Sequence, residues 1–396
     1  MPRAVGNEVN MNRFGFLFIF LFYGGTNFYI ARRLYLWIHS FFPRMNAVLF
    51  GIVFFLLSSS TLISLILSDR SIGSFFGAMG NHWMGIYVFL LTFFLLSDIV
   101  SLILKLTKVI PKALSPEKYL FFSGLLVLLV TIFLGVYGRY TAMDIKTTEY
   151  HITIEKKDTS LEGLNMVMIS DVHLGYINDS AFFENLVSKI NALAPDVVLI
   201  AGDFFDGNFH ALNHPEKVSD ALQKIESTYG VFLCYGNHDA GTSFARMDQL
   251  VKDGNVTVLE DTAVSVQDLF YVIGRKDASP IGGQGEARKD FEELEGFSDL
   301  SLPIFVLDHK PSHLLEYKNE VDLVLCGHTH QGQIFPFRYV TERMFLVDYG
   351  YYFDEGVVPQ VVVSSGVGTW GLPIRIGTKS EIVQIHIQFE EQKDVA

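Results

Sequence analysis

The sequence predicts a two-part fold, in which an all-α membrane domain of about four transmembrane helices precedes a layered α/β domain. The first observation is compositional, since 49% of the 396 residues are hydrophobic and only 18% are charged. The second is the distribution of charge, because residues 1–150 hold 12 basic and 6 acidic side chains, whereas residues 151–396 hold 18 and 37. The third is periodicity, since runs of about 20 apolar residues give way to short apolar runs that alternate with helical patterns.

Composition also excludes several classes of protein. The high apolar content excludes a disordered chain, a collagen-like chain and a highly charged coiled coil. Two cysteines exclude a disulfide scaffold and a zinc module with paired cysteine motifs. A net charge of −13 argues against a broad basic face, so no nucleic-acid partner is expected.

The membrane domain is expected over residues 1–145. Four apolar runs approach the roughly 20 residues that a helix needs to cross a bilayer core. They cover residues 14–30, 46–67, 83–104 and 119–138. The first run has Gly24, Gly25 and Asn27 near its middle, so three spans with an interfacial helix are the alternative.

Positive charge in the short loops predicts the orientation of these helices. Arg32, Arg33 and Arg44 follow the first run, and four lysines follow the third: Lys105, Lys108, Lys112 and Lys118. Both loops are therefore expected in the cytoplasm, which places the N-terminus and the α/β domain outside it. The sequence predicts an integral protein of the cell membrane with an extracytoplasmic α/β domain.

Asp98 lies inside the third apolar run, and an intramembrane carboxylate is a functional hypothesis by default. The alternative is a structural role at a helix interface, with a hydrogen bond to Ser or Thr of a neighbouring helix. We favour the structural role because the runs show no basic partner. A transporter would have only Asp98 in support, without an obvious pair of broken helices.

The second half alternates short apolar runs with helical spacing, which predicts a layered α/β domain over residues 161–390 after a linker at 146–160. Strands are expected at residues 165–170, 196–201, 230–235, 303–307, 321–326, 360–364 and 381–389. Helical spacing occurs at residues 181–193, 216–227 and 312–317.

Five of these strands end in clusters of Asp, His or Asn, and ligands bind at the carboxyl ends of strands in open α/β sheets. The candidate metal ligands are Asp171, His173, Asp203, Asn237, His309, His328 and His330. Carboxylate, imidazole and amide ligands without thiolate suit Mn²⁺, Fe or Zn²⁺. Seven ligands exceed the needs of one four-coordinate metal and suit two metals that share a carboxylate, hold a hydroxide nucleophile and clamp a phosphoryl group.

Two further residues are candidates for catalysis. His238 follows Asn237 directly and is expected to protonate the leaving oxygen, with Asp206 as the carboxylate that orients it. Taken singly, Asp203 or Asp206 could cap a helix, and His309 could be a core or surface histidine. Cys234 and Cys326 are interpreted as small buried core residues. The ordered combination of motifs favours a site over these separate roles.

These motifs resemble the calcineurin-like metallophosphoesterases, and stretches after residue 327 resemble the membrane-anchored bacterial YkuE/YaeI-like branch. The matching residues are Asp171-x-His173, Gly202-Asp203-x-x-Asp206, Gly236-Asn237-His238-Asp239, His309 and Gly327-His328-x-His330. The resemblance implies a four-layer α/β/β/α sandwich. It also implies a first metal on Asp171, His173 and His330, a second on Asn237, His309 and His328, and Asp203 as the bridge.

Two departures separate the chain from the protein Ser/Thr phosphatases of this superfamily. Gly207 stands where those enzymes have a phosphate-gripping arginine, and Asp239 stands where they have a glutamate. Both weaken a protein-phosphatase interpretation. His151, His210, His214 and His313 are expected to be exposed or to line the pocket wall.

The predicted function is a membrane-anchored, metal-dependent phosphoester hydrolase with two divalent ions per chain, Mn²⁺ first and Fe or Zn²⁺ as alternatives. Its predicted partners are the lipid bilayer and a phosphodiester, phosphomonoester or pyrophosphate substrate, either lipid-linked or part of the cell envelope; no protein partner is predicted. The alternative is a catalytically silent metal-binding sensor or scaffold. Phe335, Phe337, Tyr349, Tyr351, Tyr352 and Trp370 either form an apolar rim or pack the second sheet.

Overall fold

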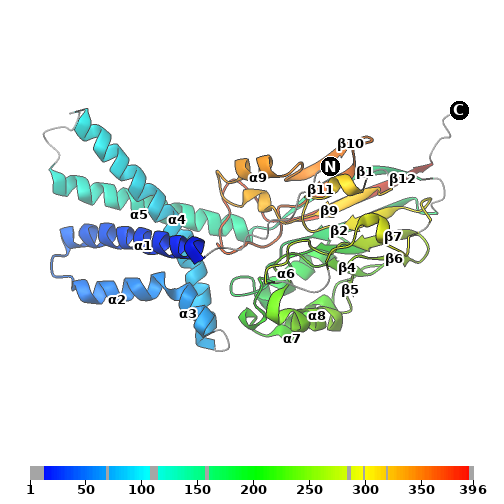
Figure 1. Cartoon of the computed structure of the whole chain (residues 1–396), viewed down its shortest axis with the longest axis horizontal. Helices are drawn as coiled ribbons and strands as arrows, with labels where there is room; N and C mark the ends of the chain where they lie inside the picture. Colours follow the sequence, from blue (N-terminus) through cyan, green and yellow to red (C-terminus); the bar gives the residue numbers. More distant parts are fainter. Residues whose placement is uncertain are drawn as a thin grey trace. The chain divides into compact units, whose positions relative to one another are not determined.

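The computed structural model describes residues 13–67, 71–107, 115–156, 160–282, 287–297, 299–317 and 320–391 (Figure 1). The chain divides into two compact units. The first comprises residues 1–66 and 75–136, and the second comprises residues 67–74 and 137–396. Lys108, Lys112 and residues 157–159 of the predicted linker lie outside the described residues.

Helices build the N-terminal part: α1 (Arg13–Phe41), α2 (Ala47–Ser58), α3 (Ser60–Ile66), α4 (Ser71–Leu106) and α5 (Pro116–Met143). Among the described residues, the segments Ile72–Leu106 and Glu117–Met143 are long and apolar enough to cross a membrane. The pair α2 and α3 becomes a third candidate if it counts as one span. The expectation of four spans therefore stays a prediction.

The predicted second span is bent, because α2 and α3 meet at an angle of 59° around Ser59. Ser60 Oγ donates to the Leu57 carbonyl oxygen at 2.7 Å, and the hydroxyl of Tyr23 donates to the Ser58 carbonyl oxygen at 2.8 Å. Hydroxyls that bond to helix carbonyls compete with the backbone ladder and bend helices. The three consecutive serines at 58–60 were the sequence feature that could have predicted this break.

Asp98 has a basic partner, contrary to the sequence-based expectation of a Ser or Thr partner. Arg33 Nη1 lies 3.2 Å from Asp98 Oδ1, and the hydroxyl of Tyr29 donates to Asp98 Oδ2 at 2.6 Å. The guanidinium of Arg33 also lies 5.2 Å from the ring centroid of Phe94. The expectation failed because Arg33 was assigned to a loop, whereas α1 continues to Phe41 and carries Arg33 beside α4.

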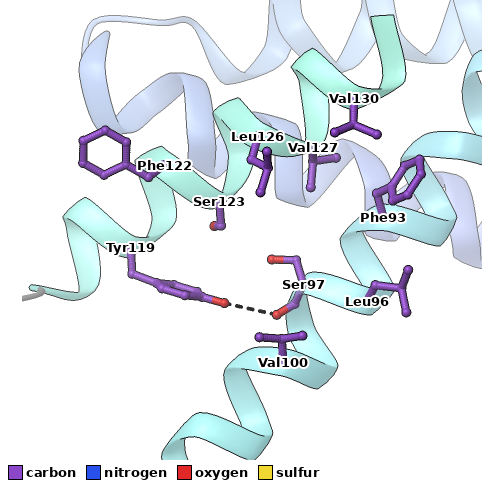
Figure 2. Close-up of a pocket in the computed structure, with 10 residues that line it drawn as sticks. All are labelled: Phe93, Leu96, Ser97, Val100, Tyr119, Phe122, Ser123, Leu126, Val127 and Val130. Atoms are coloured by element: carbon purple, nitrogen blue, oxygen red, sulfur yellow. Dashed lines mark hydrogen bonds between the residues drawn. The ribbon is translucent and has the colours of Figure 1, made fainter. Parts of the chain in front are cut away.

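A pocket of about 420 Å³ lies between α4 and α5 (Figure 2). Its walls are almost wholly apolar, with Phe93, Val100 and Val127 among the lining residues. The Tyr119 hydroxyl crosses the gap and donates to the Ser97 carbonyl oxygen at 3.1 Å (Figure 2). The pocket therefore offers apolar contact and little hydrogen bonding.

Two six-stranded sheets build the second unit. The first has the order β1-β12-β2-β3-β4-β5 and the second the order β10-β11-β9-β8-β7-β6. The first sheet's strands are β1 (Lys146–Lys156), β12 (Glu381–Glu391), β2 (Gly163–Ile169), β3 (Val197–Ala201), β4 (Val231–Cys234) and β5 (Thr257–Val258). The second sheet's are β10 (Gly350–Asp354), β11 (Val358–Val363), β9 (Leu323–Cys326), β8 (Ile304–Leu307), β7 (Phe270–Gly274) and β6 (Thr262–Val266).

Three apolar clusters order these elements into layers. Met166, Leu199 and Phe305 belong to a cluster shared by the two sheets. The other face of the first sheet packs on α6 (Ser180–Asn191), α7 (Pro215–Leu222) and α8 (Phe244–Asp253). The other face of the second sheet packs on the short turns η3 (Phe291–Glu293) and η4 (Leu314–Glu316). A fourth layer of α-helices therefore stays unconfirmed.

Most expected strands form where the short apolar runs lie, whereas two other expectations differ from the structure and several elements are additional. Residues 146–156, expected as linker, form β1, which pairs in parallel with β12 through the register His151↔His386. Residues 312–317 form only the η4 turn instead of a helix. Several elements were not expected, namely α8, β5, β6, β7, β10 and α9 (Arg338–Met344).

Candidate metal centre

Parallel strands from both sheets end beside the predicted ligands. Strands β2, β3 and β4 are parallel neighbours, and Asp171, Asp203 and Asn237 each follow one of them by two or three residues. Strands β8 and β9 are parallel neighbours in the second sheet, and they precede His309 and His328. The shared direction of these strands brings their carboxyl ends, and hence these side chains, to one place.

The backbone at these strand ends is strained. Asp171, His173, Asp203, His328 and His330 all have positive φ angles, between 47° and 70°. Residues other than glycine seldom adopt this left-handed conformation, and such strain concentrates at functional sites. The positions that carry the predicted ligands are thus the positions where the fold tolerates an unfavourable backbone.

One group of ligands consists of Asp171, His173 and His330, which are all buried and offer ligand atoms within 4.8 Å of one another. The Nε2 atoms of His173 and His330 lie 3.1 Å apart, and His330 Nε2 lies 3.3 Å from Asp171 Oδ1. The Asp171 carboxylate also accepts the backbone N–H of His328 at 3.0 Å. These separations match ligand atoms that converge on a single small cation.

The second group consists of Asp203, His309 and His328. His309 Nε2 lies 3.2 Å from Asp203 Oδ2, and His328 Nδ1 lies 3.3 Å from His309 Nε2. His309 Nδ1 lies 2.9 Å from the Ala201 carbonyl oxygen, which can accept its proton. That contact leaves the Nε2 lone pair free for a metal, as is usual for metal-binding histidines.

Asp203 connects the two groups, and Asn237 lies between Gly236 and His238, which both approach Asp203. Asp203 Oδ2, which contacts His309, also lies 3.6 Å from His173 Nε2 of the first group. Asn237 Oδ1 is buried and has no hydrogen-bond partner among the described residues. Since buried polar atoms are nearly always satisfied, this orphaned oxygen, in the residue next to His238, fits a ligand to a divalent cation.

Glycines before the ligand motifs permit this close approach. A Cβ atom at Gly236 would collide with the backbone N and carboxylate of Asp203, and one at Gly327 would collide with the Asp171 carboxylate. The Gly-Asn-His-Asp and Gly-His-x-His motifs therefore begin with glycine because the carboxylates pass directly over the backbone at these points.

Burial and mutual attraction set the charges of the site. Burial opposes a charge on either Asp203 or His309, but their contact lowers the pKa of Asp203 and raises the pKa of His309. Burial and the neighbouring His309 lower the pKa of His328 to about 3. Burial with His173 and Arg375 holds the pKa of His330 well below its ordinary value. Metals bind to neutral imidazoles and ionised carboxylates, so the shifts of Asp203, His328 and His330 favour metal binding, whereas His309 would release a proton when a metal binds.

His238 lies at the edge of the two groups. Its backbone N–H donates to Asp203 Oδ1 at 2.8 Å, and its ring centroid lies 5.1 Å from that of His173 and 6.0 Å from that of Trp370. Burial lowers the pKa of His238, although Asp203 opposes the shift. Half-buried and beside the ligands, His238 is placed where a general acid would be needed.

The carboxylate of Asp206 lies against the ring of His173. Asp206 Oδ1 lies 3.4 Å from His173 Nδ1. Asp206, His173 and His238 each offer a ligand atom, and these three atoms lie within 4.8 Å of one another. Asp206 can therefore orient the ligand His173 in the way that carboxylates hold metal-binding histidines. Its expected role in orienting His238 stays a prediction.

Arg375 is a positioning residue that sequence reasoning missed. It is fully buried, donates to the carbonyl oxygens of Ser365 and Gly368 at 2.6 and 2.7 Å, and places Nη2 3.3 Å from His330 Nδ1. Arg375 ends a Leu-Pro-Ile-Arg stretch in the part after residue 327, where the sequence shows only a resemblance to the YkuE/YaeI-like branch. A buried arginine could not be inferred because nothing local fixes its burial.

Two buried aspartates also support the site. Asp239 accepts the backbone N–H groups of Phe204 and Phe205 at 3.1 and 2.7 Å, which holds the loop after Asp203. Asp308, next to His309, binds both terminal nitrogens of Arg288 at 2.9 Å and accepts the Tyr317 hydroxyl. The sequence indicated the aspartates but not their partners, since these are distant in the chain.

The remaining predicted residues fall into two sets. Cys234 and Cys326 are buried core residues, as predicted. His151, His210 and His214 are exposed and His313 is half-buried, as expected for residues outside the metal centre.

The sheets, the strand-end ligands and the sequence comparisons agree on one class of protein. Residues 164–332 match the calcineurin-like phosphoesterase family. The chain belongs to this metallophosphoesterase family. Its relatives include an uncharacterized metallophosphoesterase of Campylobacter jejuni, which is 30% identical over 378 residues and aligns with 93% of this chain and 97% of its own length.

Two further relatives differ in their coverage. A zebrafish (Danio rerio) "transmembrane protein with metallophosphoesterase domain" is 30% identical over 330 residues, which is 77% of this chain and 74% of the relative. The uncharacterized metallophosphoesterase YkuE of Bacillus subtilis is 30% identical over 256 residues, which is 62% of this chain and 87% of the relative. Together with the long apolar helices, the transmembrane relative indicates that the chain is membrane-associated.

Proposed function

We propose that the chain is a membrane-anchored phosphoester hydrolase that uses two divalent metal ions and acts on a lipid-linked phosphoester. The observation that carries the hydrolase proposal is the position of Asp203. A single oxygen, Oδ2, approaches His173 of one ligand group at 3.6 Å and His309 of the other at 3.2 Å. One carboxylate can therefore serve two ions, which is the arrangement of two-metal phosphoesterases.

The residues of the chain then take distinct parts. When bound, the two ions would neutralise phosphoryl charge and lower the pKa of water. Asp171, His173 and His330 would hold one ion, Asn237, His309 and His328 the other, and Asp203 both. His238 would give its proton to the leaving oxygen, since its ring stands beside the ligands and is only partly covered. The oxygen and nitrogen donors favour Mn²⁺, with Fe or Zn²⁺ as alternatives.

An apolar rim next to the ligands supports a lipid-linked substrate. Phe335, Phe337, Leu346 and Trp370 expose between 54% and 57% of their surface. The rim reaches the site, because Trp370 contacts the ring of His238 and Phe345 lies 5.9 Å from the ring of His328. Large exposed apolar patches mark interaction sites for membranes, proteins or ligands.

The aromatic residues that the sequence singled out divide between rim and packing. Phe335, Phe337, Tyr351 and Trp370 are exposed. Tyr352 packs against the core of the second sheet, and the Tyr349 hydroxyl donates to Glu381. Part of the aromatic set therefore forms an exposed rim, and the other part packs within the domain.

Helix α9 extends the rim. It has no buried residue and carries Tyr339, Val340 and Met344 together with Arg338 and Arg343. Exposed apolar and basic side chains on one short helix are typical of segments that lie in the headgroup region of a bilayer. A substrate whose phosphoryl group projects from the membrane surface would meet the rim first and the ligands next.

The charge bias of the short loops supports an extracytoplasmic position for the metallophosphoesterase domain in the cell membrane. An introduced cysteine tests it cleanly, because both native cysteines are buried. Lys217→Cys in α7 lies on the exposed surface. A membrane-impermeant maleimide should label it in intact cells, and labelling only after lysis would reverse the proposed orientation.

The activity test uses the full chain in detergent, stripped of metal and reloaded with Mn²⁺. We expect hydrolysis of bis-p-nitrophenyl phosphate or p-nitrophenyl phosphate that disappears on chelation and returns with Mn²⁺. The preferred substrate distinguishes a phosphodiesterase from a phosphatase. No hydrolysis of either ester, with two ions bound per chain, would favour the silent sensor instead.

The lipid proposal has its own test. The double variant Phe337→Ala with Leu346→Ala removes rim area without touching a proposed ligand. We expect hydrolysis of a phospholipid in vesicles to fall about tenfold, since the lost area weakens membrane contact. Hydrolysis of the soluble ester should stay within twofold. Leu315→Ala, an exposed apolar change on η4, is the matched control, and equal losses on both substrates would contradict a lipid role.

A further inference from the structure

A second cluster of metal-ligating side chains lies outside the site described above. Glu149 and His151 of β1 and His386 of β12 offer ligand atoms that all lie within 4.8 Å of one another. The two imidazole rings are stacked, with centroids 4.9 Å apart and an interplanar angle of 21°. This cluster shares no residue with the strand-end ligand groups.

Strand pairing creates the cluster. Strands β1 and β12 are parallel, and their register sets His151 directly opposite His386. Glu149 precedes His151 by two residues, so both side chains point to the same face of the sheet. The alternate residues Ile152 and Ile154 are buried between the sheets, which turns the three ligands outward. Glu149 and His151 are exposed and His386 is half-buried, so an ion can reach them.

We propose that Glu149, His151 and His386 form a second metal site, which binds one Zn²⁺ or a similar transition-metal ion between the first and last strands of the domain. Two imidazoles and one carboxylate suit Zn²⁺, Cu²⁺ or Ni²⁺ better than Mg²⁺ or Ca²⁺. Zinc–ligand bonds of about 2.0–2.2 Å require donor atoms closer together than 4.8 Å. Small rotamer changes suffice to close that gap, because the side chains are on the surface.

The position of the cluster on the first and last strands of the domain indicates a structural role for the ion. Residues 151 and 386 lie at opposite ends of the second unit's chain, and β1 is the edge strand of its sheet. Cross-links that close long loops restrict the unfolded chain most. The ion would therefore hold the edge strand β1, which follows the last apolar helix directly, to the C-terminal strand. Ligand binding to the folded state alone raises stability by mass action.

The test measures Zn²⁺ bound by the full-length protein in detergent, after metal removal and titration, together with the unfolding temperature. We expect His386→Ala to bind one equivalent fewer than the wild type and to lose the Zn²⁺-dependent rise in Tm. Hydrolysis of the soluble phosphoester should remain within twofold, since His386 is remote in sequence and role from the strand-end ligands.

Two further variants keep the result decisive. His214→Ala removes another exposed histidine beside a glutamate, Glu216, and should bind as many equivalents as the wild type. Glu149→Gln preserves the shape of the side chain and should lower the affinity for the additional Zn²⁺ by at least about tenfold. Even the mutation of a residue that only hydrogen-bonds to a metal ligand lowers affinity by that much. If His386→Ala does not fold, Glu149→Gln decides alone. Unchanged Zn²⁺ stoichiometry and affinity in these variants would overturn the proposal.

Discussion

Two polar clusters, one in each unit, surround carboxylates with different partners. In the helical unit, Asp98 accepts a hydrogen bond from Tyr29 and pairs with Arg33. In the sheet unit, Asp171 and Asp203 face histidines on strained backbone, beside an orphaned Asn237 oxygen. The helical cluster neutralises its charge with the chain's own residues. The strand-end cluster leaves donors converging on a point, which is the mark of a site that binds something else.

The comparison teaches how to judge whether a carboxylate in an apolar segment or a core has a structural or a functional role. An intramembrane aspartate is a functional hypothesis by default, but a complete set of internal partners favours a structural role. At the strand ends, backbone strain and incomplete hydrogen bonding have no structural benefit of their own. Four substitutions sharpen or break this distinction.

The largest expected effect is on Asp203. Asp203→Asn removes one negative charge from the carboxylate shared by both ligand groups, and we expect kcat to fall at least about 10³-fold. Bound Mn²⁺, measured by elemental analysis, should fall with it. Asp220→Asn on the exposed face of α7 is the matched control. Full activity in Asp203→Asn would contradict the role of Asp203 as the shared ligand, on which the proposed function depends.

His238 should matter for proton transfer rather than for metal content. His238→Gln is expected to lower kcat by about 10²–10⁴-fold while leaving Mn²⁺ stoichiometry unchanged. The loss should be smallest for p-nitrophenyl esters, whose leaving group needs little protonation, and larger for alkyl esters. An equal loss with both leaving groups would argue against the acid role, as would loss of the metal.

Arg375 tests whether the support of His330 is structural or catalytic. Arg375→Met leaves the carbonyl oxygens of Ser365 and Gly368 without their donor, and we expect a loss of about 2–4 kcal/mol in the free energy of unfolding. Mn²⁺ affinity should fall as well, because the His330 loop loses its support. Arg375→Lys should recover part of both. The exposed Arg343→Ala should change stability by no more than about 0.5 kcal/mol.

Asp98 should give the smallest effect. Asp98→Asn keeps an acceptor for Tyr29 but weakens the pair with Arg33, so we expect a loss of about 1 kcal/mol in stability, measured by thermal unfolding in detergent. Phosphoester hydrolysis should not change. Tyr29→Phe, which removes one hydroxyl, should lower the stability by no more than Asp98→Asn does. A large loss of hydrolysis in Asp98→Asn with stability intact would break the comparison and make this cluster functional.

Much of the site could be predicted because its motifs are local. A short apolar run followed by glycine and a polar cluster predicts both a buried strand and its end. For this reason the sequence placed Asp171, Asp203, Asn237, His309 and His328 directly after strands, where the structure has them. The resemblance to the metallophosphoesterases supplied the division of these residues between two ions.

The expectations that failed depended on contacts between distant residues. Residues 146–156 carry polar side chains on alternate positions, and the sequence alone predicts a linker there, because their partner strand lies more than 200 residues away. The bend at Ser59 and the Arg33–Asp98 pair likewise depend on neighbouring helices. Local patterns carry no information on which helix faces which.

By itself, the sequence determined the positions of the apolar runs, of most strands that lead to the site, and of the polar residues at their ends, because hydrophobic periodicity and glycine placement act within a few residues. Only the tertiary structure decided that Asp206 lies against His173 and that Arg375 supports His330. It also decided that Glu149, His151 and His386 meet on one face. Those contacts arise from strand register and packing between segments far apart in the chain, which no local pattern encodes.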